Sequence, residues 1–160
     1  MTLTATIRRA EERDREELAR LSFRSKAYWG YDAAFMESVR EQLTPSESYV
    51  AGGRVFLAEA PNGSILGFYG FLYEDDQLWL YDMFIAPEAI RTGIGRLLWH
   101  HCVEFARTTG ERAFSIESDP NAEEFYLKMG AVRDGQRIAA GSGRTLPVLR
   151  YDLSFSGEPD

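Results

Sequence analysis

The spacing of hydrophobic residues predicts one strand and two helices near the start of the chain. Residues 4–9 predict a short strand, and residues 14–24 predict a helix with its apolar side chains on one face. A loop over residues 25–31 follows. Asp32 is suited to cap a second helix, whose apolar residues keep helical spacing as far as Leu43.

The middle of the chain changes to the shorter period of strands. Two apolar runs, residues 55–60 and 65–73, flank an Asn62-Gly63 pair that favours a tight hairpin turn. An acidic turn at residues 74–76 leads to a third run, residues 78–85. This run is apolar on both faces and is therefore predicted to be central in a sheet. The region predicts three consecutive antiparallel strands.

Helical spacing returns after Pro87 and then alternates with strands. A helix is predicted to begin at Ile94 and to stop near Gly110. The remaining predicted elements are a strand over residues 113–117, a helix over residues 120–129 closed by Gly130, and a last strand over residues 148–155 reached through a glycine turn at residues 141–143. We expect one domain over residues 1–155 and a flexible tail over residues 156–160.

The composition is that of one globular domain. The chain has 160 residues, of which 44% are hydrophobic and 27% charged, and its formal net charge is −7. This length suits a single hydrophobic core. The acidic balance argues against a general nucleic-acid binder, because no excess of positive charge is present to displace counterions.

Cysteine usage and hydropathy limit the function further. Cys102 is the only cysteine, so an internal disulfide and a multi-cysteine zinc site are excluded. His100, His101 and Cys102 are consecutive helix positions about 100° apart, so they cannot converge on one metal ion without other ligands, and packing in the core and at the surface is the better interpretation. The first nine residues lack the apolar core of a secretory signal, and no apolar run is long enough to span a bilayer. We expect a cytoplasmic protein with no metal, membrane or nucleic-acid partner.

The stretch after the third predicted strand has the pattern of an anion-binding loop. Pro87 breaks the strand, and Gly93-Ile94-Gly95 opens a helix whose first N–H groups lack partners within the helix. Glycine allows close approach of a ligand, while the helix dipole favours a pyrophosphate. Arg91 and Arg96 add positive charge. The alternative is a connection chosen only for its turn geometry.

Two better known phosphate loops do not fit this stretch. A Walker loop requires Gly-Lys-Ser/Thr at the start of the helix, where this chain has Gly95-Arg96-Leu97. A Rossmann loop requires a third glycine and a parallel βαβ unit, whereas antiparallel strands are predicted here.

The stretch resembles the Gcn5-related N-acetyltransferase (GNAT) superfamily. The family pattern is a strand, a proline break and Gln/Arg-x-x-Gly-x-Gly/Ala at the start of a long helix, and this chain departs from it by Ile90 at the first position. A later segment with Asn121, Phe125-Tyr126 and Gly130 resembles the second family motif. The resemblance implies an α/β (α+β) fold: a mixed sheet of about seven strands, helices on both faces, and a splay at a central β-bulge.

The resemblance also implies a binding site for acetyl-coenzyme A (acetyl-CoA). Residues at the start of the helix would bind the pyrophosphate, strand amides would bind the pantetheine and thioester, and two later residues would complete the site. These implied cofactor residues are Arg91, Thr92, Gly93, Ile94, Gly95 and Arg96, then Met83, Phe84 and Ile85, and finally Asn121 and Phe125. Asn121 has the alternative role of a helix cap.

Three residues are candidates for proton transfer. Tyr126 matches the family's tyrosine general acid, because a phenol is protonated at neutral pH and can donate to the leaving thiolate. Its alternative is a helix tyrosine that packs its ring and exposes its hydroxyl. Asp82 and Glu117 are candidate bases, each of which has the equal alternative of a structural carboxylate.

The acceptor is expected in the cleft that would hold the cofactor, on the side away from the coenzyme A site. Tyr28, Trp29 and Tyr31 are suited to cover it, or else to pack between helices. Arg144 is suited to hold an acceptor carboxylate, or else to pair with a surface acid.

The resemblance implies direct acetyl transfer to an amine. The acidic balance and Asp82 favour a small-molecule amine or an amino-acid-like acceptor. Two alternatives stay open: a non-catalytic acyl-CoA-binding or sensing module, suggested by Ile90, and a protein N-acetyltransferase. Dimers are common in the superfamily, and the sequence neither requires nor excludes a homodimer.

Overall fold

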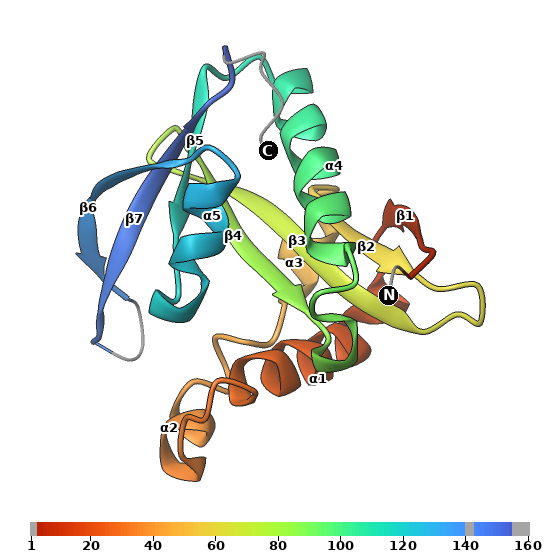
Figure 1. Ribbon diagram of the computed structural model, residues 1–160. Helices are drawn as coiled ribbons and strands as arrows, with labels where there is room; N and C mark the ends of the chain where they lie inside the picture. Colours follow the sequence, from red (N-terminus) through yellow and green to blue (C-terminus); the bar gives the residue numbers. More distant parts are fainter. Residues whose placement is uncertain (1–2, 140–142, 155–160) are drawn as a thin grey trace.

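A seven-stranded mixed sheet forms the centre of the molecule (Figure 1). The computed structural model describes residues 3–139 and 143–154, and the strand order is β1-β2-β3-β4-β5-β7-β6. The strands are β1 (Thr6–Arg9), β2 (Val55–Glu59), β3 (Ile65–Glu74), β4 (Gln77–Ile85), β5 (Ala113–Glu117), β6 (Val132–Ile138) and β7 (Thr145–Asp152). The predicted α/β fold class and the three consecutive antiparallel strands are confirmed.

The sheet splits between β4 and β5. These two strands are parallel, and in the described structure they pair at Trp79 with Ser115 and at Leu80 with Ile116. Beyond Leu80 the strands diverge, as Figure 1 shows for β4 (green) and β5 (teal). The second half of β4 therefore pairs with β3 on one edge only.

A β-bulge lies at the start of this splay. Gly70 of β3 pairs with Asp82, while Phe71 pairs with Leu80, so Tyr81 is the extra residue on β4. A bulge bends its strand and increases its twist, which turns the following residues away from the neighbouring strand. The implied central bulge is thus present.

Helices cover both faces of the sheet. They are α1 (Arg15–Ala27), α2 (Ala33–Ser38), α3 (Glu47–Ala51), α4 (Ile94–Thr108) and α5 (Glu123–Lys128), with 3₁₀ turns at Glu12–Asp14, Pro87–Ala89 and Pro120–Ala122. Tyr69 of β3 bonds to His101 of α4, whereas Gly70 faces Tyr49 of α3. Because adjacent strand residues point to opposite faces, α4 and α3 lie on opposite sides.

The main core packs α4 against one face of the sheet and also includes Leu18 and Leu21 of α1. Trp99 of α4 is almost fully buried, and its ring contacts Phe114, Phe125, Tyr126 and Tyr151. None of the helices in the described residues is both long and apolar enough to cross a membrane.

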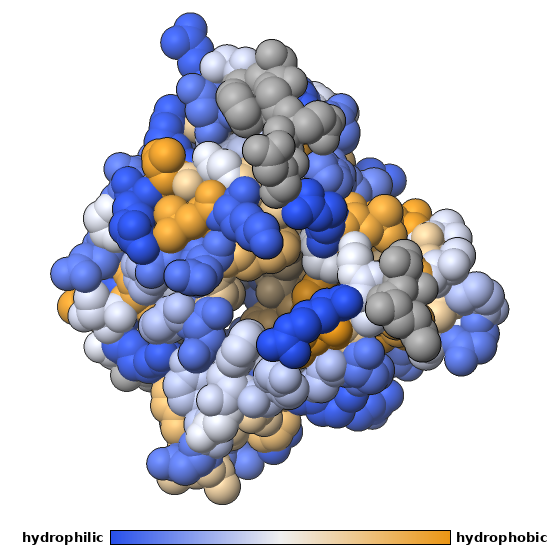
Figure 2. All heavy atoms as spheres, viewed as in Figure 1, coloured by the Kyte–Doolittle hydropathy of each residue, from blue (hydrophilic) through white to orange (hydrophobic). Residues whose placement is uncertain are grey.

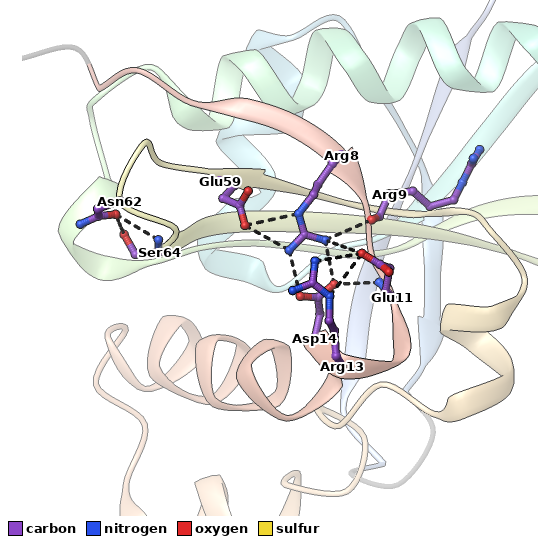
Figure 3. Close-up of polar contacts among 8 residues, drawn as sticks. All are labelled: Arg8, Arg9, Glu11, Arg13, Asp14, Glu59, Asn62 and Ser64. Atoms are coloured by element: carbon purple, nitrogen blue, oxygen red, sulfur yellow. Dashed lines mark hydrogen bonds and ion pairs between the residues drawn. The ribbon is translucent and has the colours of Figure 1, made fainter.

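An ion-pair cluster attaches β1 to the start of α1 (Figure 3). The Arg8 guanidinium donates to both oxygens of the Asp14 carboxylate, at 2.9 and 3.0 Å, and also to Glu59 of β2. Asp14 is buried and accepts a further bond from the Glu11 amide. The Arg8 hydrogen bond outweighs the opposing effect of burial, so the pKa of Asp14 is lowered.

Several predicted boundaries were wrong. The second helix ends at Ser38 instead of Leu43, although Val39 and Leu43 remain buried beside Met36. The last strand begins at Thr145, before its predicted start at residue 148. The predicted tail, 156–160, and residues 141–142 of the glycine turn lie outside the described residues.

Two elements were not located by the sequence. Helix α3 has only five residues, too few to show a helical period, and begins where the Ser46 hydroxyl accepts from the Tyr49 amide. Strand β6 lies at the sheet edge and is almost wholly exposed, so its polar sequence shows no alternation of buried residues.

Candidate active site

A cleft of about 780 Å³ opens where β4 and β5 diverge. Figure 2 shows the molecule hollowed near the middle of this face, with hydrophobic residues (orange) at depth and hydrophilic residues (blue) around the rim. Its lining comes from β4, the start of α4, the start of α5, α1, and the facing parts of β6 and β7. The cleft joins two predicted sites, the anion-binding loop and the candidate bases.

The anion-binding loop forms one end of the cleft. Gly93 is the N-cap of α4 and has φ +93°, a conformation that glycine adopts without strain. No side chain caps this helix among the described residues, so the helix presents its first N–H groups at the cleft. Arg91, Gly93, Gly95 and Arg96, four of the predicted cofactor residues, line the cleft.

Two predicted members of this loop hold it in place. The Thr92 hydroxyl donates to the Ala89 carbonyl, and the Thr92 carbonyl accepts from the Leu3 amide at 3.2 Å. The Ile94 side chain is fully buried in the core. Neither side chain lines the cleft, so any contact of these two residues with a ligand must come from the backbone.

The second half of β4 forms the floor of the cleft. Met83, Phe84 and Ile85 pair with Tyr69, Phe68 and Gly67 of β3, and have no pairing with β5. All three line the cleft. Their free backbone groups can bind an extended ligand as an added strand would. Phe125 of α5 lies against Gly95, 3.4 Å from where a Cβ would be.

Asp82 is the carboxylate at the bulge. It lines the cleft, and burial raises its pKa to about 7, with the neighbouring Tyr49 hydroxyl opposing the rise. A carboxylate with a pKa near neutrality can accept and release a proton under ordinary conditions.

Glu117 is held by an ion pair. The Arg137 guanidinium donates to Glu117 and, at 2.9 Å, to Glu74, while it stacks 3.9 Å above the Trp79 ring. The two candidate bases therefore differ: within the described part of the chain, Glu117 has a cationic partner and Asp82 has none.

Tyr126 is buried with its ring 5.9 Å from Trp99, and it lines the cleft. Burial raises the pKa of its phenol above the usual value, so the hydroxyl stays protonated. The structure thus places a candidate base, Asp82, and a candidate acid, Tyr126, on one cleft.

A polar cluster closes the cleft between α1 and α5. Lys26 donates to Asp119 at 2.6 Å, and the Tyr31 hydroxyl donates to Asp119 while it accepts from Asn121 and Arg144. Burial acts to raise the pKa of Asp119, but hydrogen bonds from Lys26 and Asn121 outweigh it, and the pKa is lowered. Arg144 stacks 5.1 Å from the Tyr31 ring centre.

The loop after α1, which carries Tyr28, Trp29 and Tyr31, contributes one of these three aromatic residues to the lining of the cleft. Trp29 and Tyr28 are both about half exposed, with their rings 5.4 Å apart. Trp29 lines the cleft, whereas Tyr28 and Tyr31 do not.

Several lining residues escaped the sequence analysis. They are Lys26, Glu74, Tyr81 and Arg137. Each is a common surface residue type, and no spacing along the chain marks it. Among the described residues, no three His, Cys, Asp or Glu side chains come together as a metal site would require.

Comparison with known protein families identifies the family of this chain. A family model described as "Acetyltransferase (GNAT) domain" matches residues 11–146. The chain belongs to the GNAT acetyltransferase family. No curated protein sequence matches it.

Solved GNAT structures share the fold at low sequence identity. A GCN5-related N-acetyltransferase from Rhodopseudomonas palustris has a TM-score of 0.76 and 18% identity, and the match covers 95% of this chain and 98% of that one. PaiA N-acetyltransferase from Thermoplasma acidophilum, in complex with coenzyme A, has a TM-score of 0.72 and 16% identity over 94% and 99%. The YncA protein of Salmonella typhimurium, with its cofactor acetyl-CoA, has a TM-score of 0.66 and 20% identity over 98% of both chains.

Proposed function

We propose that this GNAT protein transfers an acetyl group from acetyl-CoA to the amine of a small molecule. One observation carries the proposal: a single cleft joins the amide groups at the start of α4 to Asp82, a carboxylate with a pKa of about 7. The first feature suits a pyrophosphate, and the second suits removal of a proton from an ammonium group.

The residues fit coenzyme A. Gly93 places no side chain at the N-terminus of α4, and Gly95, Arg91 and Arg96 line the same end of the cleft. The unpaired edge of β4 continues from this end toward Asp82. Ile90 at the first motif position does not remove this site, because the proposed contacts come from the backbone.

Asp82 and Tyr126 divide the proton transfers. When bound, acetyl-CoA supplies the acetyl group as a reactive thioester. Asp82 accepts a proton from the acceptor ammonium, which frees the nitrogen lone pair to form the N–C bond. Tyr126 would give its hydroxyl proton to the sulfur atom as the C–S bond breaks. The nitrogen loses its second proton to solvent after the N–C bond forms, Asp82 releases its proton to solvent, and solvent restores the proton of Tyr126. Arg137 keeps Glu117 out of these steps by pairing with it.

The charges at the acceptor end favour a cationic substrate. Glu74, Asp82 and Glu117 line this end together with one arginine, Arg137. Trp29 and Tyr81 add aromatic surface for the substrate or its cation. Arg144 and Lys26 lie toward α5, where Arg144 is suited to pair with a carboxylate of an amino-acid-like acceptor.

The test is release of free thiol from acetyl-CoA with panels of amines, amino acids and peptides. We expect acceleration by small primary amines, and identification of the N-acetyl product by mass spectrometry. Coenzyme A affinity is measured in parallel by calorimetry. Tight binding with no acceleration by any acceptor supports the sensing module instead, and acceleration by peptides alone supports protein acetylation.

A further inference from the structure

Tyr49 is a partly buried tyrosine with a buried hydroxyl oxygen, and the proposed reaction does not use it. It lies on α3, and its hydroxyl oxygen is buried with no hydrogen-bond partner among the described residues. A buried polar atom without a partner costs free energy and calls for an explanation. The ring is packed edge-on against Tyr81, the bulge residue, with centroids 5.7 Å apart. The hydroxyl is therefore held at a defined place.

That place is beside Asp82. A Cβ atom at Gly70 would lie 1.9 Å from the Tyr49 hydroxyl, so the hydroxyl occupies the space of the missing side chain. Gly70 pairs with Asp82 across β3 and β4. Paired residues point to the same face with Cβ atoms about 4.5–5.5 Å apart. The Tyr49 hydroxyl thus lies next to the Asp82 side chain.

Other charged groups around Asp82 already have partners. Lys26 of α1 is paired with Asp119, and Glu117 of β5 is paired with Arg137 of β6. The remaining titratable groups that interact with Asp82 are phenols: Tyr81 beside it on β4, Tyr126 on α5, and Tyr49. Of these, the Tyr49 hydroxyl is the one that favours the ionised carboxylate.

We propose that Tyr49 is a positioning residue for the general base: its hydroxyl donates a hydrogen bond to the ionised Asp82 carboxylate and directs the other oxygen of that carboxylate into the cleft. This inference rests on the proposed function, in which Asp82 is the base. Burial and the hydroxyl act on Asp82 in opposite directions. Burial makes the carboxylate basic, while the phenol keeps enough of it ionised near neutral pH to accept a proton.

The deciding experiment measures the Asp82 pKa directly. Carboxyl carbons of aspartate are labelled with carbon-13 and titrated by NMR in the wild type and in Tyr49→Phe, with Asp82→Asn assigning the signal. Loss of the hydroxyl removes a bond to a charged group, so we expect the pKa to rise by about one pH unit, a tenfold change in proton affinity. This readout requires no enzymatic activity.

Tyr69→Phe is the matched control. Tyr69 precedes Gly70 on β3, is buried, and bonds to His101 on the opposite face of the sheet. It should leave the Asp82 pKa unchanged. An Asp82 pKa that is the same in Tyr49→Phe and in the wild type overturns the inference.

The pH dependence of kcat/KM, taken together with the titration, separates this inference from the proposed function. In Tyr49→Phe, kcat/KM should fall about tenfold at pH 6 and approach the wild-type value at pH 9, where Asp82 is ionised in both proteins. A deficit equal at all pH values overturns the positioning role. A Tyr49-dependent pKa in a protein that acetylates nothing overturns the proposed function and leaves the pairing of Tyr49 with Asp82 established.

A second variant covers a failure of Tyr49→Phe to fold. Site-specific 3-fluorotyrosine at position 49 keeps the shape of the ring and makes the hydroxyl a stronger donor. We then expect the Asp82 pKa to fall below the wild-type value. An unchanged Asp82 pKa in this protein also overturns the inference.

Discussion

The two ends of the cleft are built from different parts of the polypeptide. At the coenzyme A end, the proposed contacts come from backbone groups of α4 and β4, beginning at Gly93. At the acceptor end, ionisable side chains from separate strands meet: Glu74 of β3, Asp82 of β4 and Arg137 of β6. The difference shows that the two ends can change independently. We expect the backbone end to tolerate Ile90 at the first motif position, and the acceptor end to depend on the identity of each side chain.

The largest effect is expected at the acceptor end, for Asp82→Asn. Removal of the base should lower kcat by about 10²–10⁴-fold and leave coenzyme A affinity within about twofold of the wild type. In the wild type, kcat/KM should rise with pH through about 7, because Asp82 must lose its proton to act. The measurement is a pH–rate profile with calorimetry of coenzyme A. Asp134→Asn, at an exposed position on β6, is the control.

The pH dependence of the stability of Asp82→Asn tests the raised pKa independently of activity. Since the folded-state pKa of Asp82 is raised, the folded protein binds its proton more tightly than the unfolded chain. Asp82 therefore becomes destabilising as the pH rises from about 4 to about 7. Asp82→Asn should gain stability relative to the wild type between pH 4 and pH 8, as measured by urea unfolding. A loss of coenzyme A affinity in this variant would contradict the independence of the two ends.

A smaller effect is expected at the junction of the two ends, for Tyr126→Phe. The phenol protonates a thiolate, which is already a good leaving group, so kcat should fall by about 10–100-fold with coenzyme A affinity unchanged. The measurement is steady-state kinetics with the best acceptor. Tyr151→Phe is the control, because Tyr151 also packs on Trp99 and does not line the cleft. Unchanged turnover would remove Tyr126 from the reaction.

The smallest effect is expected at the coenzyme A end, for Gly93→Val. A branched side chain in the loop should obstruct the pyrophosphate and weaken coenzyme A binding by about tenfold, or about 1.4 kcal/mol. Gly110→Val is matched to it: Gly110 follows the other end of α4, has φ +81°, and would bring its Cβ into open space. Both variants carry similar backbone strain, so the difference between them isolates the contact with coenzyme A. Equal affinities in the two variants would contradict the anion-binding loop.

The sequence predicted the features that are encoded by residues close together in the chain. A strand, a proline break, two glycines and a helix follow one another directly, so the anion-binding loop is encoded within about a dozen residues. The hairpin and the central strand were also predicted, because continuous apolar runs bounded by turn residues mark strands that are buried on both faces. Local signals failed where they were short or polar, as in α3 and β6.

The tertiary structure decided which side chains meet. Lys26 and Asp119 are 93 positions apart, and Arg137 reaches Glu74 over 63 positions. The contact of Tyr49 with the space above Gly70 places a phenol beside Asp82 through a cross-strand register. Backbone geometry is set by a few adjacent dihedral angles, whereas a side-chain environment is set by the packing of distant elements. The sequence alone therefore predicted the family, the anion-binding loop and the candidate bases. Only the structure showed that Glu117 has an ion-pair partner in Arg137, while no ion pair of Asp82 is found among the described residues.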